Sequence, residues 1–156
     1  MKLKILAVGQ KMPAWVTQAY QEYAKRLPRE CALSLVEIAP AKRTKNSEVG
    51  KILEEEGKRM LAAINAADYV VALELKGKQW STDDLAQKMT TWQGVHSVIV
   101  LMIGGADGLS DQCLARANEQ WCLSKLTFPH PLVRVVLAEQ LYRGWSLMNN
   151  HPYHRE

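Results

Sequence analysis

The sequence contains few cysteines, and none of them form a closely spaced pair. Its 156 residues include Cys31, Cys113 and Cys122, and no two of these make a Cys-x-x-Cys motif. An odd number of cysteines at these spacings does not fit a disulfide framework or a cysteine metal site. We therefore expect no metal, and we interpret the three cysteines as buried or half-buried free thiols.

Long apolar runs are also missing. No stretch approaches the roughly 18 consecutive apolar residues that a membrane-spanning helix needs. Residues 1–9 are partly apolar, but the chain turns polar at Gln10 and Lys11, and no small-residue cleavage site follows. Without that pattern the amino terminus does not read as a signal peptide. We expect a cytoplasmic protein without a membrane segment, and the length fits a single domain over residues 1–156.

Positive charge is concentrated in the first part of the chain. The formal net charge is +4, and residues 1–60 hold 12 Lys or Arg against 7 Asp or Glu, whereas residues 61–156 hold 8 against 9. Lys42, Arg43 and Lys45 lie close together in the segment PAKRTKN, residues 40–46, which we name the basic loop. Such a surface is either simply solvated or binds a polyanion, with nucleic acid the favoured one.

Apolar periodicity alternates between that of strands and that of helices along the whole chain. The pattern predicts strands over residues 2–8, 31–38, 68–75, 98–103 and 120–123, and helices over 13–27, 48–65, 81–92, 110–118 and 130–149. Regular alternation of this kind indicates an α/β fold, with a parallel sheet and helices on both faces. Residues 76–78 (KGK) are expected to form a turn after the third strand.

The most informative stretch is Val98–Ser110, VIVLMIGGADGLS. Six apolar residues in a row are typical of a strand buried on both faces. The glycines that follow permit positive φ and close approach of another molecule, and Ser110 can cap the next helix. Ligands of open α/β sheets bind at this carboxyl edge, but a tight connection without a ligand explains the stretch equally well. The spacing matches neither the dinucleotide fingerprint nor the phosphate loop.

The last long helix is apolar around most of its circumference. Leu132, Val136, Leu141 and Trp145 are among its apolar residues, and little of its surface is left polar. We therefore expect it to be covered by more than its own domain, and a two-fold homodimer is the simplest closed arrangement. His130, at its start, is either a helix cap or a site residue.

The segments that flank this helix carry further candidates. The loop Leu123–Pro129 follows the last strand and precedes a helix amino terminus with free N–H groups, so this loop and the glycine turn could wall one pocket. The final residues, HPYHRE from His151 to Glu156, concentrate histidine, tyrosine and arginine in what is usually a featureless chain end.

Taken together, these motifs resemble one family. The segments KLKILAVGQKMPAWV, IGGADGLS and LSKLTFPHPLVRVVLAEQLYRGWSLMNNHPYHRE are similar to the bacterial pseudouridine N3-methyltransferases of the large ribosomal subunit, within the SPOUT class. The resemblance covers the whole chain and departs mildly from its relatives at Ala106 and Asp107. It implies a homodimer and a deep trefoil knot over about residues 98–150. General folding rules would have argued against a knot.

The resemblance also implies a reaction and its residues. The methyl donor is S-adenosyl-L-methionine, the acceptor is N3 of a pseudouridine in 23S ribosomal RNA, and the partner is the ribosome. The implied donor site consists of Leu73, Gly104, Gly105, Leu123, Ser124, Lys125, Leu126, Thr127 and Phe128. The implied catalytic residues are His130, Tyr153, His154 and Arg155.

Three alternatives remain open at this point. The proton of the acceptor base is taken by one of the histidines or by solvent. A ribose 2′-O-methyltransferase acting on transfer RNA, or a ribosome-binding factor without enzymatic activity, could have a similar basic surface. The tail could act within its own subunit or in a partner.

Overall fold

Alternating strands and helices build one five-stranded sheet in the computed structural model, which describes residues 1–155. Its elements are β1 (Lys2–Val8), α1 (Ala14–Ala24), η1 (Arg29–Cys31), β2 (Leu33–Ile38), α2 (Val49–Ala62), β3 (Tyr69–Gln79), α3 (Thr82–Val95), β4 (Val98–Ile103), α4 (Asp111–Arg116), β5 (Glu119–Cys122), α5 (His130–Met148) and η2 (Pro152–Arg155). The strand order is β2-β1-β4-β3-β5, and neighbouring strands run parallel. The predicted α/β class is confirmed. Glu156, the last residue of the predicted tail and domain, lies outside the described residues.

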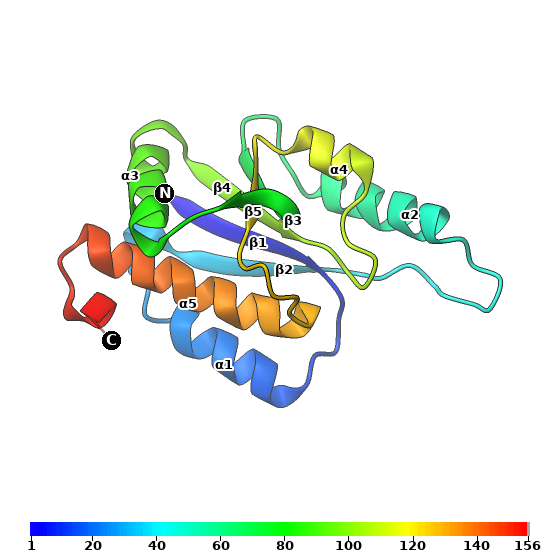
Figure 1. Cartoon of the computed structure of the whole chain (residues 1–156), viewed down its shortest axis with the longest axis horizontal. Helices are drawn as coiled ribbons and strands as arrows, with labels where there is room; N and C mark the ends of the chain where they lie inside the picture. The colour runs from blue at the N-terminus through cyan, green and yellow to red at the C-terminus, as the bar shows by residue number, and fades with distance from the viewer. Residues whose placement is uncertain (156) are drawn as a thin grey trace.

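The helices cover both faces of the sheet, with α1 and α5 on one face and α2 and α4 on the other (Figure 1). Alternate side chains of a strand point to opposite faces. Ile5 and Leu101 accordingly pack in one core with Leu137 of α5, whereas Val100 packs in the other with Met60 of α2. Because β4 is buried on both faces, its sequence is continuously apolar instead of alternating, and the prediction for this strand is confirmed.

The predicted turn at residues 76–78 is wrong, because β3 continues to Gln79. Its pairing with β5 shifts register between Leu73 and Lys78, so the strand carries a local irregularity instead of ending. A Cβ placed on Gly77 would lie 2.6 Å from the backbone carbonyl carbon of Gln120. The glycine therefore serves a close approach between two strands.

Polar caps start two of the helices as expected. The Ser81 side chain accepts a hydrogen bond from the Asp84 N–H while the Asp84 carboxylate accepts from the Ser81 N–H, which is a capping box. The Ser110 hydroxyl accepts from the Cys113 N–H at 3.2 Å and caps α4. All three cysteines are free and buried, as predicted.

Helix α5 is the longest helix among residues 1–155 and packs against both α1 and α3. No helix in this part of the chain combines the length and the apolar character needed to cross a membrane. The knot over residues 98–150 stays a prediction. The strand order, which places β5 beside β3 and so brings the segment after β5 next to the glycine turn, is consistent with it.

Candidate functional site

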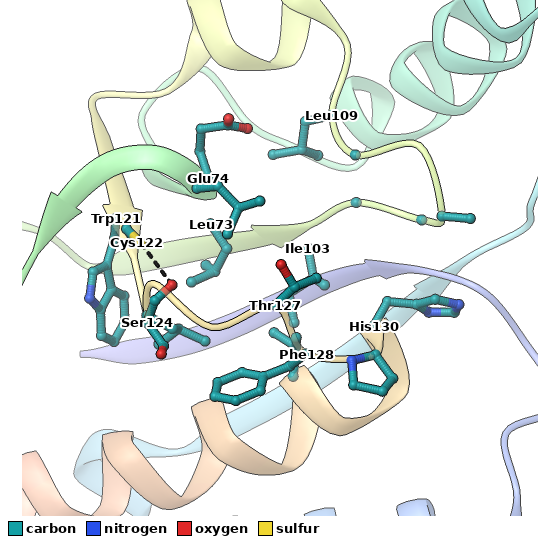
Figure 2. A pocket seen from close by; sticks show the side chains of 18 of the residues that line it. Leu73, Glu74, Ile103, Leu109, Trp121, Cys122, Ser124, Thr127, Phe128 and His130 are labelled. Carbon is teal, nitrogen blue, oxygen red and sulfur yellow. Dashed lines mark hydrogen bonds between the residues drawn. The ribbon is translucent and has the colours of Figure 1, made fainter.

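A cavity of about 730 Å³ opens at the carboxyl ends of β4 and β5 and beside the middle of β3, where its pairing with β5 is interrupted (Figure 2). These strands are neighbours in the sheet, so the loops that follow them converge at one edge, where ligands of open α/β sheets bind. Its lining residues are Leu73, Glu74, Leu75, Ile103, Gly104, Gly105, Ala106, Asp107, Gly108, Leu109, Leu114, Trp121, Cys122, Leu123, Ser124, Leu126, Thr127, Phe128, Pro129, His130 and Val133.

Most of the predicted donor site lies in this cavity. Lys125 is the predicted donor residue that is not among its lining residues. In Figure 2, Leu73 and Thr127 point into the space between β3 and the loop that precedes α5. Leu126 lines the same cavity with 71% of its surface exposed, so this leucine is available to cover a bound molecule.

The glycine turn, residues 104–108, is held closed by its own backbone. Gly105 and Gly108 form an isolated antiparallel bridge, and the Gly108 N–H donates to the Gly105 carbonyl at 3.0 Å. A Cβ on Gly104 would lie 2.4 Å from the carbonyl carbon of Gly108, so no other residue fits there.

Within the glycine turn, Gly108 has a positive φ of 83°, whereas Gly104 and Gly105 do not use the positive φ that glycine permits. A Cβ on Gly105 would point beneath the turn, 3.1 Å from Val8 Cγ1 and 3.4 Å from Glu56 Oε1.

The second loop is ordered by short local hydrogen bonds. The Leu126 N–H donates to the Ser124 hydroxyl at 3.0 Å, and the Cys122 thiol donates to the Ser124 carbonyl at 3.1 Å. Serine side chains that bond to backbone groups two residues away stabilise turns. The loop therefore presents its leucines and backbone to the cavity in a fixed shape.

The charged groups that line the cavity are acidic. Glu74 and Asp107 are its carboxylates, and no Lys or Arg of residues 1–155 lines it. Burial, followed by the nearby Arg134 guanidinium, lowers the pKa of His130, while Glu56 opposes that change. The imidazole is thus neutral at pH 7. A pocket of this charge favours a cationic ligand over a phosphate.

Two buried ionic groups fix elements that adjoin the cavity. Arg134 of α5 is 2% exposed, donates to the Glu37 carboxylate at 2.7 Å and to the Gly9 carbonyl at 2.9 Å, and so fixes α5 against the ends of β1 and β2. Glu56 is 3% exposed, and its Oε2 accepts from the Ala41 N–H at 3.1 Å, at the start of the basic loop. Sequence reasoning missed both residues, because a charged residue within a helix gives no sign of burial.

The basic loop is tied to the glycine turn. Arg43 forms an ion pair with Asp107 at 2.5 Å, with side chains 43% and 24% exposed. Sequence reasoning placed Arg43 on an RNA-binding surface but did not foresee this partner, which lies 64 positions further along the chain. Lys42 and Lys45 are exposed.

The tail does not reach the cavity of its own chain. Tyr153 folds back along the second half of α5, where its hydroxyl donates to Glu139 at 2.9 Å and its ring lies tilted against Tyr142 and under the Arg143 guanidinium. His130 begins α5 at the cavity, whereas Glu139 lies nine residues further along the helix, an axial rise of about 14 Å, and no residue of 151–155 lines the cavity. The structure therefore brings His130 to the cavity but separates Tyr153, His154 and Arg155 from it.

No group of three or more potential metal ligands among His, Cys, Asp and Glu is found in residues 1–155. The residues that surround the cavity instead offer backbone groups, apolar side chains and two carboxylates. These are groups suited to an organic ligand with a flat apolar part and a positive charge.

Comparison with known proteins identifies the fold and its relatives. The profile of a family described as predicted SPOUT methyltransferase matches residues 1–154. A protein of Methylococcus capsulatus named ribosomal RNA large subunit methyltransferase H is 57% identical over 155 residues, covering 99% of this chain and 100% of its own length. Proteins with the same name from Hahella chejuensis and Marinomonas sp. are each 54% identical, covering 100% and 99% of this chain and all of their own lengths.

A solved structure, that of a probable methylase family protein from Haemophilus influenzae, aligns with a TM-score of 0.59. It covers 97% of this chain and 69% of that chain at 10% sequence identity, so it supports the fold alone.

Proposed function

The chain belongs to the SPOUT methyltransferases, and on this basis we propose that it transfers a methyl group from S-adenosyl-L-methionine to ribosomal RNA of the large subunit. Its relatives from three bacteria carry that function in their names and match it from end to end. The observation that carries the proposal is the cavity between the middle of β3 and the ends of β4 and β5, which is lined by two carboxylates and by no Lys or Arg within the described residues.

The cavity fits the donor chemically. Adenine is flat and largely apolar, so Leu73, Leu123 and Leu126 can cover its faces while loop backbone groups bond to its edge. The donor supplies a methyl group on a positively charged sulfur, which is already activated for transfer. Glu74 and Asp107 complement that charge, whereas a nucleotide phosphate would meet repulsion.

The acceptor we propose is N3 of a pseudouridine in 23S RNA, as the sequence resemblance implies. Transfer forms a bond between N3 and the methyl carbon, returns the electron pair of the broken bond to sulfur, and releases the N3 proton. The chain must therefore align the two reactants and accept or pass on that proton. His130, neutral and at the cavity, is the candidate proton acceptor within the same subunit.

A homodimer would bring the tail to a cavity. Leu132, Val135, Val136 and Leu147 are half-buried, and their spacing places them on one face of α5. Two α5 helices paired through this face in antiparallel orientation would set each carboxyl end beside the partner's cavity. His154 and the exposed Arg155 could then contact the acceptor base or its phosphate.

The RNA surface we propose includes the basic loop, since phosphates are its natural partners. The described residues form one sheet with its helices, and we propose that the dimer of this unit recognises the RNA. That favours a structured substrate, the assembled ribosome in the cytoplasm, over a bare RNA strand.

Methyl transfer from radiolabelled donor to ribosomes, to isolated subunits and to naked ribosomal RNA, followed by nucleoside identification, tests this function. We expect N3-methylpseudouridine from large-subunit RNA, with the ribosome the best substrate. Label on a ribose 2′ oxygen of transfer RNA would identify a different methyltransferase. Absence of both transfer and donor binding by calorimetry would leave only a ribosome-binding factor.

Mixed dimers test the contribution of the tail. One chain lacks the residues after Asn150, and the other carries Gly104→Ala, which is expected to close its donor site. Activity well above that of either homodimer would mean that an intact cavity uses the partner's tail. An inactive mixture would place the tail in its own subunit, and normal rates from the tail-deleted homodimer would contradict any role for it.

A further inference from the structure

Glu74 places a carboxylate in the donor cavity that the sequence analysis did not include. It follows Leu73 at the point where β3 meets the cavity, and Figure 2 shows its side chain rising from β3 toward Leu109. Its one hydrogen bond within residues 1–155 is a long one, in which the Lys76 N–H donates to Oε1 at 3.5 Å. The side chain is half-buried, so its charge is only partly screened by water.

The other charges at the cavity are already compensated. Asp107 forms its ion pair with Arg43 at 2.5 Å, and the lowered pKa of His130 keeps that imidazole neutral. Glu74 has no ion-pair partner in the described part of the chain. It therefore dominates the electrostatic potential that a ligand meets at the β3 side of the cavity.

We propose that Glu74 makes the cavity select the positively charged methyl donor over its uncharged reaction product. This inference rests on the proposed function, because it assumes that S-adenosyl-L-methionine binds here. Donor and product differ by the methyl group and by the positive charge on sulfur, which is lost on transfer. A carboxylate near the ligand lowers the free energy of the charged form and leaves the neutral form almost unaffected, so it favours donor binding and product release.

Glu74→Gln removes the charge and keeps the size and the hydrogen-bonding capacity. We expect the Kd for S-adenosyl-L-methionine, measured by calorimetry without RNA, to rise about three- to tenfold, the range for one partly exposed charge pair. The Kd for S-adenosylhomocysteine should change less than about twofold. The selectivity of the wild-type protein for the donor should also fall with added salt, whereas that of the variant should not.

Sinefungin distinguishes an effect of the ligand's positive charge from an effect of contacts to its methyl group. It carries an ammonium group on the carbon that replaces the sulfonium, so it is cationic but transfers no methyl group. In Glu74→Gln, the Kd for sinefungin should rise by a factor similar to that for the donor.

Two variants serve as matched controls. Glu54→Gln makes the same change on the exposed side of α2, away from the cavity, and should leave all three Kd values unchanged. Asp107→Asn removes the carboxylate that Arg43 already neutralises, and should weaken donor binding less than Glu74→Gln does. Thermal melts of each variant establish that the fold is intact.

Equal weakening of donor and product in Glu74→Gln would overturn the proposal, because it would indicate a bond to the shared ribose instead of a charge effect. Unchanged Kd values for all three ligands would overturn it as well. Wild-type protein that binds none of the three ligands would refute the proposed function itself, and the inference would fall with it. If the wild type binds the ligands but Glu74→Gln has the same selectivity for the donor, the inference is refuted and the proposed function is not.

Discussion

Substituting Gly104 by alanine should distort the glycine turn and so inactivate the donor site. The added Cβ would lie 2.4 Å from both the carbonyl carbon and the carbonyl oxygen of Gly108, and 2.9 Å from its Cα. These are backbone atoms of the same turn, so no side-chain rotation relieves the contact. The turn must widen, and the bridge between Gly105 and Gly108 must break.

A comparison with Gly108 gives the scale of the free-energy cost of alanine in this turn. Gly108 has φ of 83° with no atom within 4 Å of an added Cβ, so Gly108→Ala should cost about 1–2 kcal/mol from backbone strain alone. Gly104→Ala adds a steric conflict of about 1–3 kcal/mol inside the cavity wall. Because 1.4 kcal/mol is tenfold in a binding constant, we expect donor affinity to fall about five- to a hundredfold.

Gly94→Ala provides the control. This glycine lies in α3 with nothing within 4 Å of an added Cβ, so alanine should stabilise the protein by about 0.5–1 kcal/mol without affecting the donor. Thermal melts and calorimetric titration of S-adenosyl-L-methionine measure both effects. Normal donor affinity in a folded Gly104→Ala protein would refute the reasoning, as would loss of donor binding in Gly94→Ala.

Gly105→Val should also weaken donor binding, but for a different reason from the one the sequence suggests. The glycine turn alone suggests that a branched side chain here would enter the ligand space. In the structure it would instead press on Val8 and Glu56 beneath the turn and push the turn outward. Donor affinity and stability should therefore decrease together.

Other measurements address the remaining surfaces. Reversing Lys42 and Lys45 to glutamate should weaken ribosome binding and flatten its salt dependence while donor affinity stays normal; methylation that is unchanged across a salt series would mean that these lysines are only solvated. The pKa of His130 is lower in the folded protein than in the unfolded chain, so its contribution to stability is complete above about pH 6.5 and is lost as the pH falls; His130→Asn should therefore lose less melting temperature than the wild type between pH 7.5 and 5.5. Tyr153→Phe removes the hydrogen bond to Glu139 and should loosen the tail by about 0.5–1.5 kcal/mol, seen as faster proteolysis of the tail with unchanged global stability.

Local sequence signals predicted most of the fold because they act over a few residues. The apolar run of β4 and the Ser81 capping box each depend on neighbours along the chain, and both are confirmed. The turn predicted at residues 76–78 is wrong because a glycine such as Gly77 normally marks a turn. Here it allows close contact with Gln120, more than 40 positions away, and no local pattern records such a contact.

The site shows the same division between local and long-range information. Gly104 and Leu123 could be predicted as site residues because they lie in segments that resemble a known family. Glu74 and Glu56 are acidic residues in a strand and a helix, where sequence alone suggests solvent. The position of Glu74, directly after the apolar run of β3 at the carboxyl edge, could have identified it. Nothing in the sequence indicates that Glu56 is 3% exposed or that Arg43 pairs with Asp107.

The length of α5 bears directly on the proposed reaction. The helix begins with His130 at the cavity, and Tyr153 folds back to bond with Glu139, nine residues along the helix and about 14 Å from its start. Arg134 ties the first turns of α5 to Glu37 and Gly9, and Tyr153 ties the tail to the middle of α5 through Glu139, so the tail is held outside the cavity of its own subunit. If the tail acts on the acceptor base, it must therefore act in a second subunit. The face of α5 that carries Leu132, Val136 and Leu147, with the Glu139–Arg143 ion pair among them, would then have a catalytic role, because its pairing also sets the distance between one subunit's donor and the other subunit's tail.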